Sequence, residues 1–202
     1  YVSKLKGLKS TKTWEQIQTE SHSNFKAQFA NLLNLTRGLR IATDNLITTT
    51  SHESSLYLAT KLLISPGDQV AVASPGYYMS NMTLANSGAK ILSIPVDKYG
   101  INTKELKKRC EENTIRMVYL TSTYHYPTTV SLSAKRGIEV LELANQYGFI
   151  VLEDDYDFDF HHDNNPPLPL SSFDVNQRVI YIGSFGRSLP SGFGYGFISG
   201  PS

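Results

Sequence analysis

The sequence predicts an α/β protein with a mainly parallel sheet that carries helices on both faces. From residue 46 onward, short runs rich in β-branched and aromatic residues alternate with helical stretches, which is the pattern of βαβ units. The chain has 202 residues, of which 40% are hydrophobic, so it can bury a sizeable core. No apolar run approaches the roughly 20 residues that a bilayer requires, and we expect no membrane association.

The first element expected is a helix that begins at Phe25. Four apolar side chains share one face of it at i, i+4, i+7 and i+8: Phe25, Phe29, Leu32 and Leu33. Gly38 is a typical stop signal. The polar, lysine-rich residues 1–24 before it are expected to be an arm or a linker, and residues 25–202 to be one large domain.

Strands and helices then alternate to the end of the chain. Runs typical of strands are expected at residues 46–49, 69–73, 91–94, 117–121, 149–152, 179–182 and 195–198. Helices are expected between several of them, at residues 52–63, 78–86, 103–111 and 133–147. Thr103 and Ser133 are favoured N-cap residues, and Gly148 marks the end of the last helix before a strand.

The composition excludes several classes of function. The 19 lysines and arginines nearly balance the 18 aspartates and glutamates, so no global basic excess points to nucleic acid. The single cysteine, Cys110, excludes an intrachain disulfide framework and fits a reducing, cytoplasmic compartment. His161 and His162 lie near several aspartates, but adjacent side chains on an extended segment point apart, so we expect no metal site.

Polar and aromatic side chains follow the ends of the expected strands, where open α/β sheets bind their ligands. Ser51 opens a helix after the first strand, and a helix N-terminus with free N–H groups is a ready anion site. Tyr77 follows the second strand, Asp154 the fifth and Arg187 the sixth. One edge of the sheet is therefore predicted to hold a flat, charged and phosphorylated ring.

Several short motifs stand in a fixed order along the chain: Thr36-Arg37-Gly38-Leu39, Leu63-Ile64-Ser65-Pro66-Gly67-Asp68, Pro75-Gly76-Tyr77, His125-Tyr126-Pro127-Thr128, Glu153-Asp154-Asp155-Tyr156-Asp157 and Tyr181-Ile182-Gly183-Ser184-Phe185. Together they resemble fold-type I pyridoxal-phosphate (PLP) enzymes and, more narrowly, the aminotransferase-like domain of the GntR-type transcriptional regulators of the MocR group. The resemblance covers about Phe25 to Pro201, and its most specific part is the acidic tyrosine motif at 153–157. It implies the large domain of an aspartate aminotransferase-like fold, truncated before a small C-terminal domain.

The resemblance implies a role for each residue around the ring of the cofactor, pyridoxal 5'-phosphate. Tyr77 would stack on the pyridine ring, and Asp154 would pair with its protonated nitrogen, which keeps the cofactor an electron sink. Tyr156 would hydrogen-bond the phenolic oxygen of the ring, and His125 would lie close to it.

The resemblance also implies a phosphate site at the start of the helix after the first strand. Ser51, His52 and Glu53 would present backbone N–H groups to the phosphate, and Ser184 would add a hydroxyl. A carboxylate at Glu53 is unfavourable near a phosphate unless it turns away or is paired.

Two further positions depart from the family. Arg187 stands where the family has its Schiff-base lysine, and an arginine stays protonated and is a poor imine-forming nucleophile. Gly194 stands where the family has an arginine that clamps the phosphate. We therefore expect no catalytic residue in this chain, and PLP binding that is weakened or lost.

Three functions remain open at this point. We favour the effector-sensing and dimerisation domain of a transcriptional regulator, without catalytic activity. The first alternative is a PLP-dependent aminotransferase, and the second is an inert structural remnant that mediates dimer contacts. The expected partners are a second copy in a homodimer and a small-molecule effector, either an amino acid or a PLP-like compound. DNA is expected to bind only through an N-terminal winged-helix domain, which this chain lacks.

Overall fold

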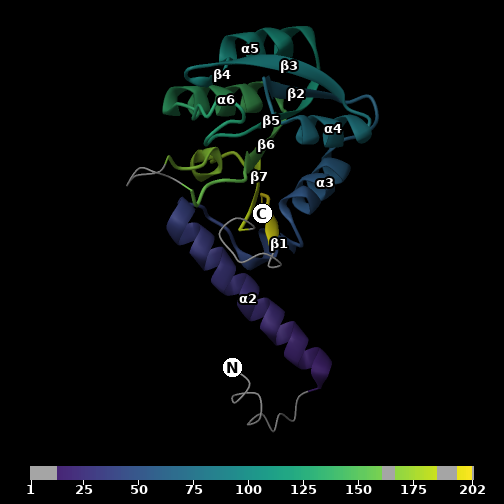
Figure 1. The fold of residues 1–202 in the computed structure, drawn as a ribbon, viewed down its shortest axis with the longest axis vertical. Helices are drawn as coiled ribbons and strands as arrows, with labels where there is room; N and C mark the ends of the chain where they lie inside the picture. The colour runs from purple at the N-terminus through teal and green to yellow at the C-terminus, as the bar shows by residue number, and fades with distance from the viewer. Residues whose placement is uncertain (1–12, 161–166, 186–194, 202) are drawn as a thin grey trace.

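The computed structural model describes residues 13–160, 167–185 and 195–201, which form an eight-stranded sheet with helices around it (Figure 1). The strand order is β1-β8-β7-β6-β5-β2-β3-β4. The strands are β1 (Leu46–Thr49), β2 (Gln69–Ser74), β3 (Lys90–Asp97), β4 (Gly100–Ile101), β5 (Ile115–Leu120), β6 (Ile150–Asp155), β7 (Val179–Ser184) and β8 (Gly196–Ser199). The five central strands from β7 to β3 pair in parallel, which confirms the predicted α/β class.

Helices cover both faces of this sheet, as predicted. They are α2 (Trp14–Arg37), α3 (His52–Leu63), α4 (Tyr78–Asn86), α5 (Thr103–Glu112) and α6 (Ala134–Tyr147), with short 3-10 turns at Thr43–Asn45 and Leu170–Phe173. Helices α5 and α6 contribute to the core on one face of the sheet, and α3 and α4 to the core on the other. Within the described ranges, no helix is both long enough and apolar enough to cross a membrane.

The central strands are apolar along their length because both of their faces are covered. In β2, Ala71 and Ala73 belong to the core cluster that contains α5 and α6. Val70 and Val72 alternate with them and belong to the cluster that contains α3 and α4. A slip of one residue in the pairing would exchange the two sets, so this alternation specifies the strand register.

The N-terminal helix is longer than the sequence pattern predicted. It begins at Trp14 and not at Phe25. Thr13 and Gln16 form a reciprocal capping box, which satisfies backbone N–H groups that the first turn of a helix leaves free. The helix ends before Gly38, as predicted, where the backbone turns left-handed with φ of 64°. Much of the polar stretch expected as an arm therefore belongs to α2.

Only part of the predicted apolar face of α2 is buried. Phe29 and Leu33 lie in a third core cluster with Tyr181 and Phe197, at the end of the sheet formed by β7 and β8. Phe25, by contrast, is exposed, and so is Leu32. The helical period of the sequence therefore identifies the helix correctly but does not define which part of its apolar stripe meets the sheet.

Candidate functional site

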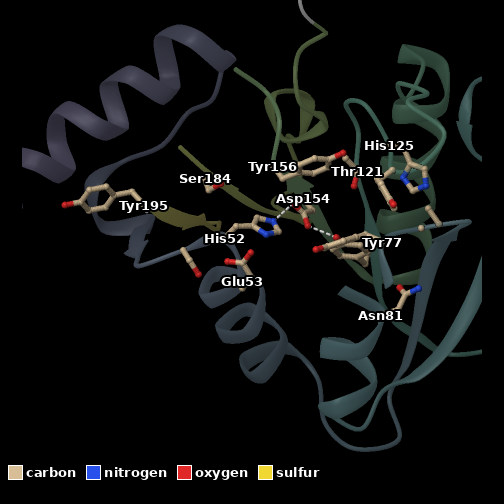
Figure 2. Close-up of a pocket in the computed structure, with 15 residues that line it drawn as sticks. His52, Glu53, Tyr77, Asn81, Thr121, His125, Asp154, Tyr156, Ser184 and Tyr195 are labelled. Atoms are coloured by element: carbon tan, nitrogen blue, oxygen red, sulfur yellow. Dashed lines mark hydrogen bonds and ion pairs between the residues drawn. The ribbon is translucent and has the colours of Figure 1, made fainter. Parts of the chain in front are cut away.

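A cavity of about 370 Å³ lies at the carboxyl ends of the central parallel strands (Figure 2). It is lined by all eight residues that the sequence analysis proposed for cofactor binding: Ser51, His52, Glu53, Tyr77, His125, Asp154, Tyr156 and Ser184. They come from β6, β7, the start of α3 and the segments that follow β2 and β5. Parallel strands bring these segments to one edge, which explains why residues far apart in the sequence meet here. Their binding of a cofactor stays a prediction.

Asp154 lies near the carboxyl end of β6, and only 1% of its surface is exposed. Its Oδ2 atom accepts a hydrogen bond from the Tyr119 hydroxyl at 2.5 Å, and its Oδ1 atom lies 2.6 Å from His52 Nε2. Burial and the nearby charge of Asp154 raise the pKa of Tyr119 well above its usual range, so the phenol stays protonated and donates. Both carboxylate oxygens of Asp154 are therefore engaged.

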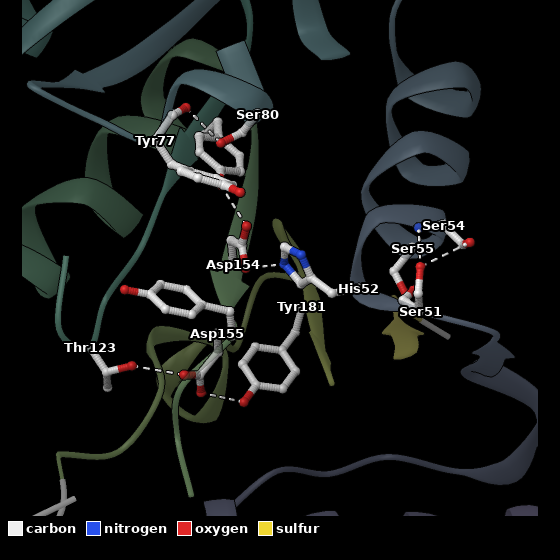
Figure 3. Close-up of polar contacts among 12 residues, drawn as sticks. Ser51, His52, Ser54, Ser55, Tyr77, Ser80, Thr123, Asp154, Asp155 and Tyr181 are labelled. Atoms are coloured by element: carbon white, nitrogen blue, oxygen red, sulfur yellow. Dashed lines mark hydrogen bonds and ion pairs between the residues drawn. The ribbon is translucent and has the colours of Figure 1, made fainter. Parts of the chain in front are cut away.

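The His52 side chain comes from the first residue of α3 and points at Asp154 (Figure 3). Burial disfavours a charged imidazole, but the charge of Asp154 and the hydrogen bond to it outweigh this effect, and the pKa of His52 is raised. This environment therefore favours the imidazolium form of His52 beside the Asp154 carboxylate. The sequence analysis gave His52 a role for its backbone N–H alone, and the position of its side chain is a finding of the structure.

The first turn of α3 holds an anion that belongs to the chain itself. Ser51 is the N-cap residue, and its Oγ atom accepts a hydrogen bond from the backbone N–H of Ser54 at 3.1 Å. Glu53 is the second residue of α3, and its own backbone N–H and the Ser51 hydroxyl lower the pKa of its exposed carboxyl below the usual value. A negative charge therefore lies at the helix start that the resemblance assigns to a phosphate.

Aromatic rings form a wall of the cavity. The rings of Tyr77 and Tyr126 meet edge to face, with their centroids 5.7 Å apart. His125 Nε2 lies 2.7 Å from the carbonyl oxygen of Pro75, and because a carbonyl only accepts, this nitrogen carries the proton. The bond connects the segment after β5 to the segment after β2, so it holds Tyr77 and Tyr126 on the same side of the cavity.

A second polar network lies beside the cavity and was not predicted from the sequence. Asp155 accepts hydrogen bonds from the Thr123 hydroxyl at 2.7 Å and from the Tyr181 hydroxyl at 2.5 Å (Figure 3). The Arg37 guanidinium donates to the Tyr181 hydroxyl at 2.7 Å and to an Asp159 carboxylate oxygen at 3.3 Å. Arg37 is fully buried, so this network anchors the end of α2 to β6 and β7.

Tyr119 is the main site residue that sequence reasoning missed. It lies in β5 among apolar residues, and its hydroxyl is the polar group that could have drawn attention to it. Asn81 and Thr121 also line the cavity and were not singled out. Short polar side chains of this kind are common at strand and helix ends, so their residue type alone carries little signal.

Four residues discussed from the sequence lie outside the described residues: Arg187, Gly194, His161 and His162. Within the described ranges, no group of three or more His, Cys, Asp or Glu side chains is arranged to hold a metal ion. The cavity itself contains carboxylates and imidazoles, but Asp154 and His52 bind each other there.

A mainly parallel α/β sheet with this set of residues at its carboxyl edge defines the fold of PLP-dependent transferases of the aminotransferase type. The chain belongs to the aminotransferase class I and II family, whose model matches residues 2–201. The expected family resemblance is therefore confirmed.

The curated relatives include both regulators and enzymes. The chain is 31% identical over 166 residues to the HTH-type transcriptional regulator TauR of Rhodobacter capsulatus, a match that covers 82% of this chain and 33% of the relative. It is 31% identical over 160 residues to the aromatic-amino-acid aminotransferase 1 of Thermococcus litoralis, covering 77% of this chain and 38% of that enzyme. The probable rhizopine catabolism regulatory protein MocR of Rhizobium meliloti is 25% identical, over 89% of this chain and 36% of the relative. The chain thus spans about a third of the length of these relatives.

Solved aminotransferase structures have the same fold. An archaeal alanine:glyoxylate aminotransferase superposes with a TM-score of 0.83 and 27% identity, covering 89% of this chain and 46% of that structure. The kynurenine aminotransferase of Pyrococcus horikoshii superposes with a TM-score of 0.80 and 27% identity, over 87% of this chain and 45% of that structure. The chain therefore corresponds to about half of an aminotransferase subunit.

Proposed function

We propose that this chain is the effector-sensing and dimerisation domain of a MocR-type transcriptional regulator, built on an aminotransferase fold that no longer catalyses. The regulators TauR and MocR among its relatives support the regulatory role. Because the chain spans only about a third of those proteins, DNA binding and dimerisation are proposed for the whole protein. The observation that carries the loss of catalysis is Arg187 at the sequence position of the family's covalent lysine, and the weakening of cofactor binding rests on the charges that line the cavity.

One end of the cavity suits the ring of PLP. Tyr77 offers an aromatic face, and Asp154 offers a carboxylate for a protonated ring nitrogen. The Tyr156 hydroxyl lies at the same wall, where it donates to the Tyr124 carbonyl oxygen at 3.1 Å. These groups support recognition of a flat nitrogen heterocycle.

The other end does not suit the phosphate of PLP. The Glu53 carboxylate lies in the first turn of α3, and it adds a negative charge where a dianion would bind. Arg187 and Gly194 stand at the sequence positions of the family's covalent lysine and phosphate-clamping arginine. The residues present therefore fit the ring and do not fit the whole cofactor.

A working aminotransferase is the second candidate, and the identity of 31% with the Thermococcus litoralis enzyme favours it. Such an enzyme needs a nucleophilic amine at the position of Arg187, because both covalent binding of the cofactor and proton transfer depend on that group. A guanidinium remains protonated across the physiological pH range and serves neither purpose. An inert dimerisation remnant is the third reading, and a complete absence of ligand binding would favour it.

The Glu53→Gln variant is expected to bind PLP about tenfold more tightly than the wild-type chain, because it removes one negative charge beside the phosphate. Equilibrium dialysis of both proteins against PLP measures this difference. The matched control is Glu142→Gln, which removes the same charge from the exposed side of α6 and should leave the affinity unchanged. Equal affinities of Glu53→Gln and wild type would show that the Glu53 carboxylate does not interfere with the phosphate.

A further inference from the structure

The pair formed by His52 and Asp154 lies within the cavity (Figure 2). The two residues come from different elements, the start of α3 and the end of β6, and their side chains meet with His52 Nε2 2.6 Å from Asp154 Oδ1. Both residues line the cavity, so their contact is made in the same space that a ligand would enter. The second oxygen of Asp154 is held by the Tyr119 hydroxyl at 2.5 Å.

This arrangement satisfies Asp154 without any ligand. A buried carboxylate needs a cation or several hydrogen bonds, because desolvation of an isolated charge is costly. Tyr119 supplies a neutral donor, and His52, whose raised pKa favours the protonated form, supplies a cationic one. A protonated heterocyclic nitrogen offers the same combination of N–H donor and positive charge as the imidazolium of His52. Two cations at one carboxylate oxygen repel each other, so the ligand must displace His52 from Asp154.

We propose that His52 is an internal competitor for the ring-binding end of the cavity: its imidazole binds Asp154 in place of a ligand's protonated ring nitrogen, and a ligand must displace it. This inference deepens the proposed function, since it names the contact that sets the affinity of the sensing pocket and the ligand class that breaks it, a protonated nitrogen heterocycle. His52 is at the same time the first residue of α3, next to Glu53.

Two ligands that differ only in a phosphate separate the two ends of the cavity. Pyridoxine and pyridoxine 5'-phosphate share the ring and lack an aldehyde, so neither reacts covalently with a lysine. If the bound state of His52 dominates in the free protein, the apparent affinity for either ligand is reduced by the fraction of molecules in which Asp154 is accessible. Removal of the imidazole lifts this reduction for both ligands, whereas the Glu53 charge acts on the phosphorylated one alone.

The experiment is a calorimetric titration of the full chain with each of the two ligands. The His52→Ala variant is expected to bind both pyridoxine and pyridoxine 5'-phosphate about tenfold or more tightly than wild type. The His52→Gln variant keeps a neutral donor for Asp154. Its affinity for each ligand should lie between those of wild type and His52→Ala. The matched control is Glu53→Gln, which is expected to improve binding of the phosphorylated ligand only.

The outcomes separate this inference from the proposed function. If His52→Ala and His52→Gln bind pyridoxine no more tightly than wild type while they retain the wild-type circular dichroism spectrum, His52 is not a competitor and the inference fails. If the His52 variants bind both ligands more tightly but Glu53→Gln binds pyridoxine 5'-phosphate no more tightly than wild type, the account of the phosphate end fails and the role of His52 stands. Should His52→Ala fail to fold, the His52→Gln titration decides, because this variant retains a hydrogen bond to the buried carboxylate.

Discussion

The Arg37→Met variant is expected to lose about 3–5 kcal/mol of unfolding free energy, which is the usual cost of removing one partner from a buried ion pair. The Arg37 guanidinium is fully buried and donates to the Tyr181 hydroxyl at 2.7 Å. Tyr181 in turn donates to Asp155 at 2.5 Å, so the cation compensates a carboxylate in the core of β6. A methionine fills similar space but leaves the Asp155 charge without this compensation. Urea denaturation measures the loss.

The loss is expected to depend on pH. Burial raises the pKa of Asp155, and the charge of Arg37 acts in the opposite direction. When folding raises the pKa of a group, protonation of that group favours the folded state. This stabilisation is lost as the pH rises from the pKa of Asp155 in the unfolded chain, about 3.9, through its pKa in the folded protein. Arg37→Met raises the folded pKa of Asp155 further, so the variant should be closer to wild type at pH 5 than at pH 8.

Arg40→Met is the matched control for this variant. Arg40 lies three positions further along the chain and is exposed, so its replacement should change the unfolding free energy by less than about 0.5 kcal/mol. An Arg37→Met protein that is as stable as Arg40→Met at both pH values would contradict the role of the guanidinium.

The Gly196→Ala variant is expected to lose about 3 kcal/mol of unfolding free energy, at the upper end of the usual cost of overpacking. A methyl group at Gly196 would lie 2.2 Å from the Ser51 carbonyl oxygen and 2.5 Å from Thr49 Oγ1. Gly196 pairs with Thr49 between β8 and β1, directly before the N-cap of α3. Backbone must therefore move at the start of α3, and the unfolding free energy should fall.

Gly200→Ala provides the comparison, because a methyl group there meets nothing within 4 Å. Both substitutions replace glycine with alanine and lower the conformational entropy of the unfolded chain in the same way. The difference between their unfolding free energies, measured by urea denaturation, therefore gives the steric effect. Equal stability of the two alanine variants would mean that β1 and the start of α3 tolerate displacement at little cost.

The alternation of strands and helices was predictable because the central strands are apolar on both faces and several helices begin with a side-chain cap, although α5 is capped by Asn102 and not by Thr103 as expected. The side chains of Ser51 and Ser133 accept hydrogen bonds from backbone N–H groups at the predicted helix starts. A serine at the N-cap position is a signal that acts within a few residues, so it can be read from the sequence. The two-residue strand β4 was not predicted, because Gly100 and Ile101 are too few to show a period. The antiparallel pairing of β8 with β1 and β7 was not predicted either, since the direction of a strand depends on the path of the chain.

The membership of the cavity was predictable from the rule that loops after parallel strands converge, and the contacts within it were not. His52 and Asp154 are separated by 102 positions, and no sequence pattern indicates that their side chains meet. The same holds for Arg37 and Tyr181, which are 144 positions apart. Such contacts depend on the relative placement of distant segments and on side-chain rotamers, which local sequence patterns do not specify. The sequence thus identified many residues that line the cavity but not the contacts between their side chains.

The central claim is that the cavity retains a ring-binding end but cannot hold PLP covalently, and one measurement tests it most directly. The wild-type chain and Arg187→Lys are incubated with PLP, reduced with borohydride, and analysed by peptide mass spectrometry. We expect no stoichiometric pyridoxyl group at any single lysine of the wild-type chain, whose lysines all lie at or before Lys135. We expect one group at position 187 of the Arg187→Lys protein. Stoichiometric labelling of one wild-type lysine, or an unlabelled position 187 in the variant, would contradict the account.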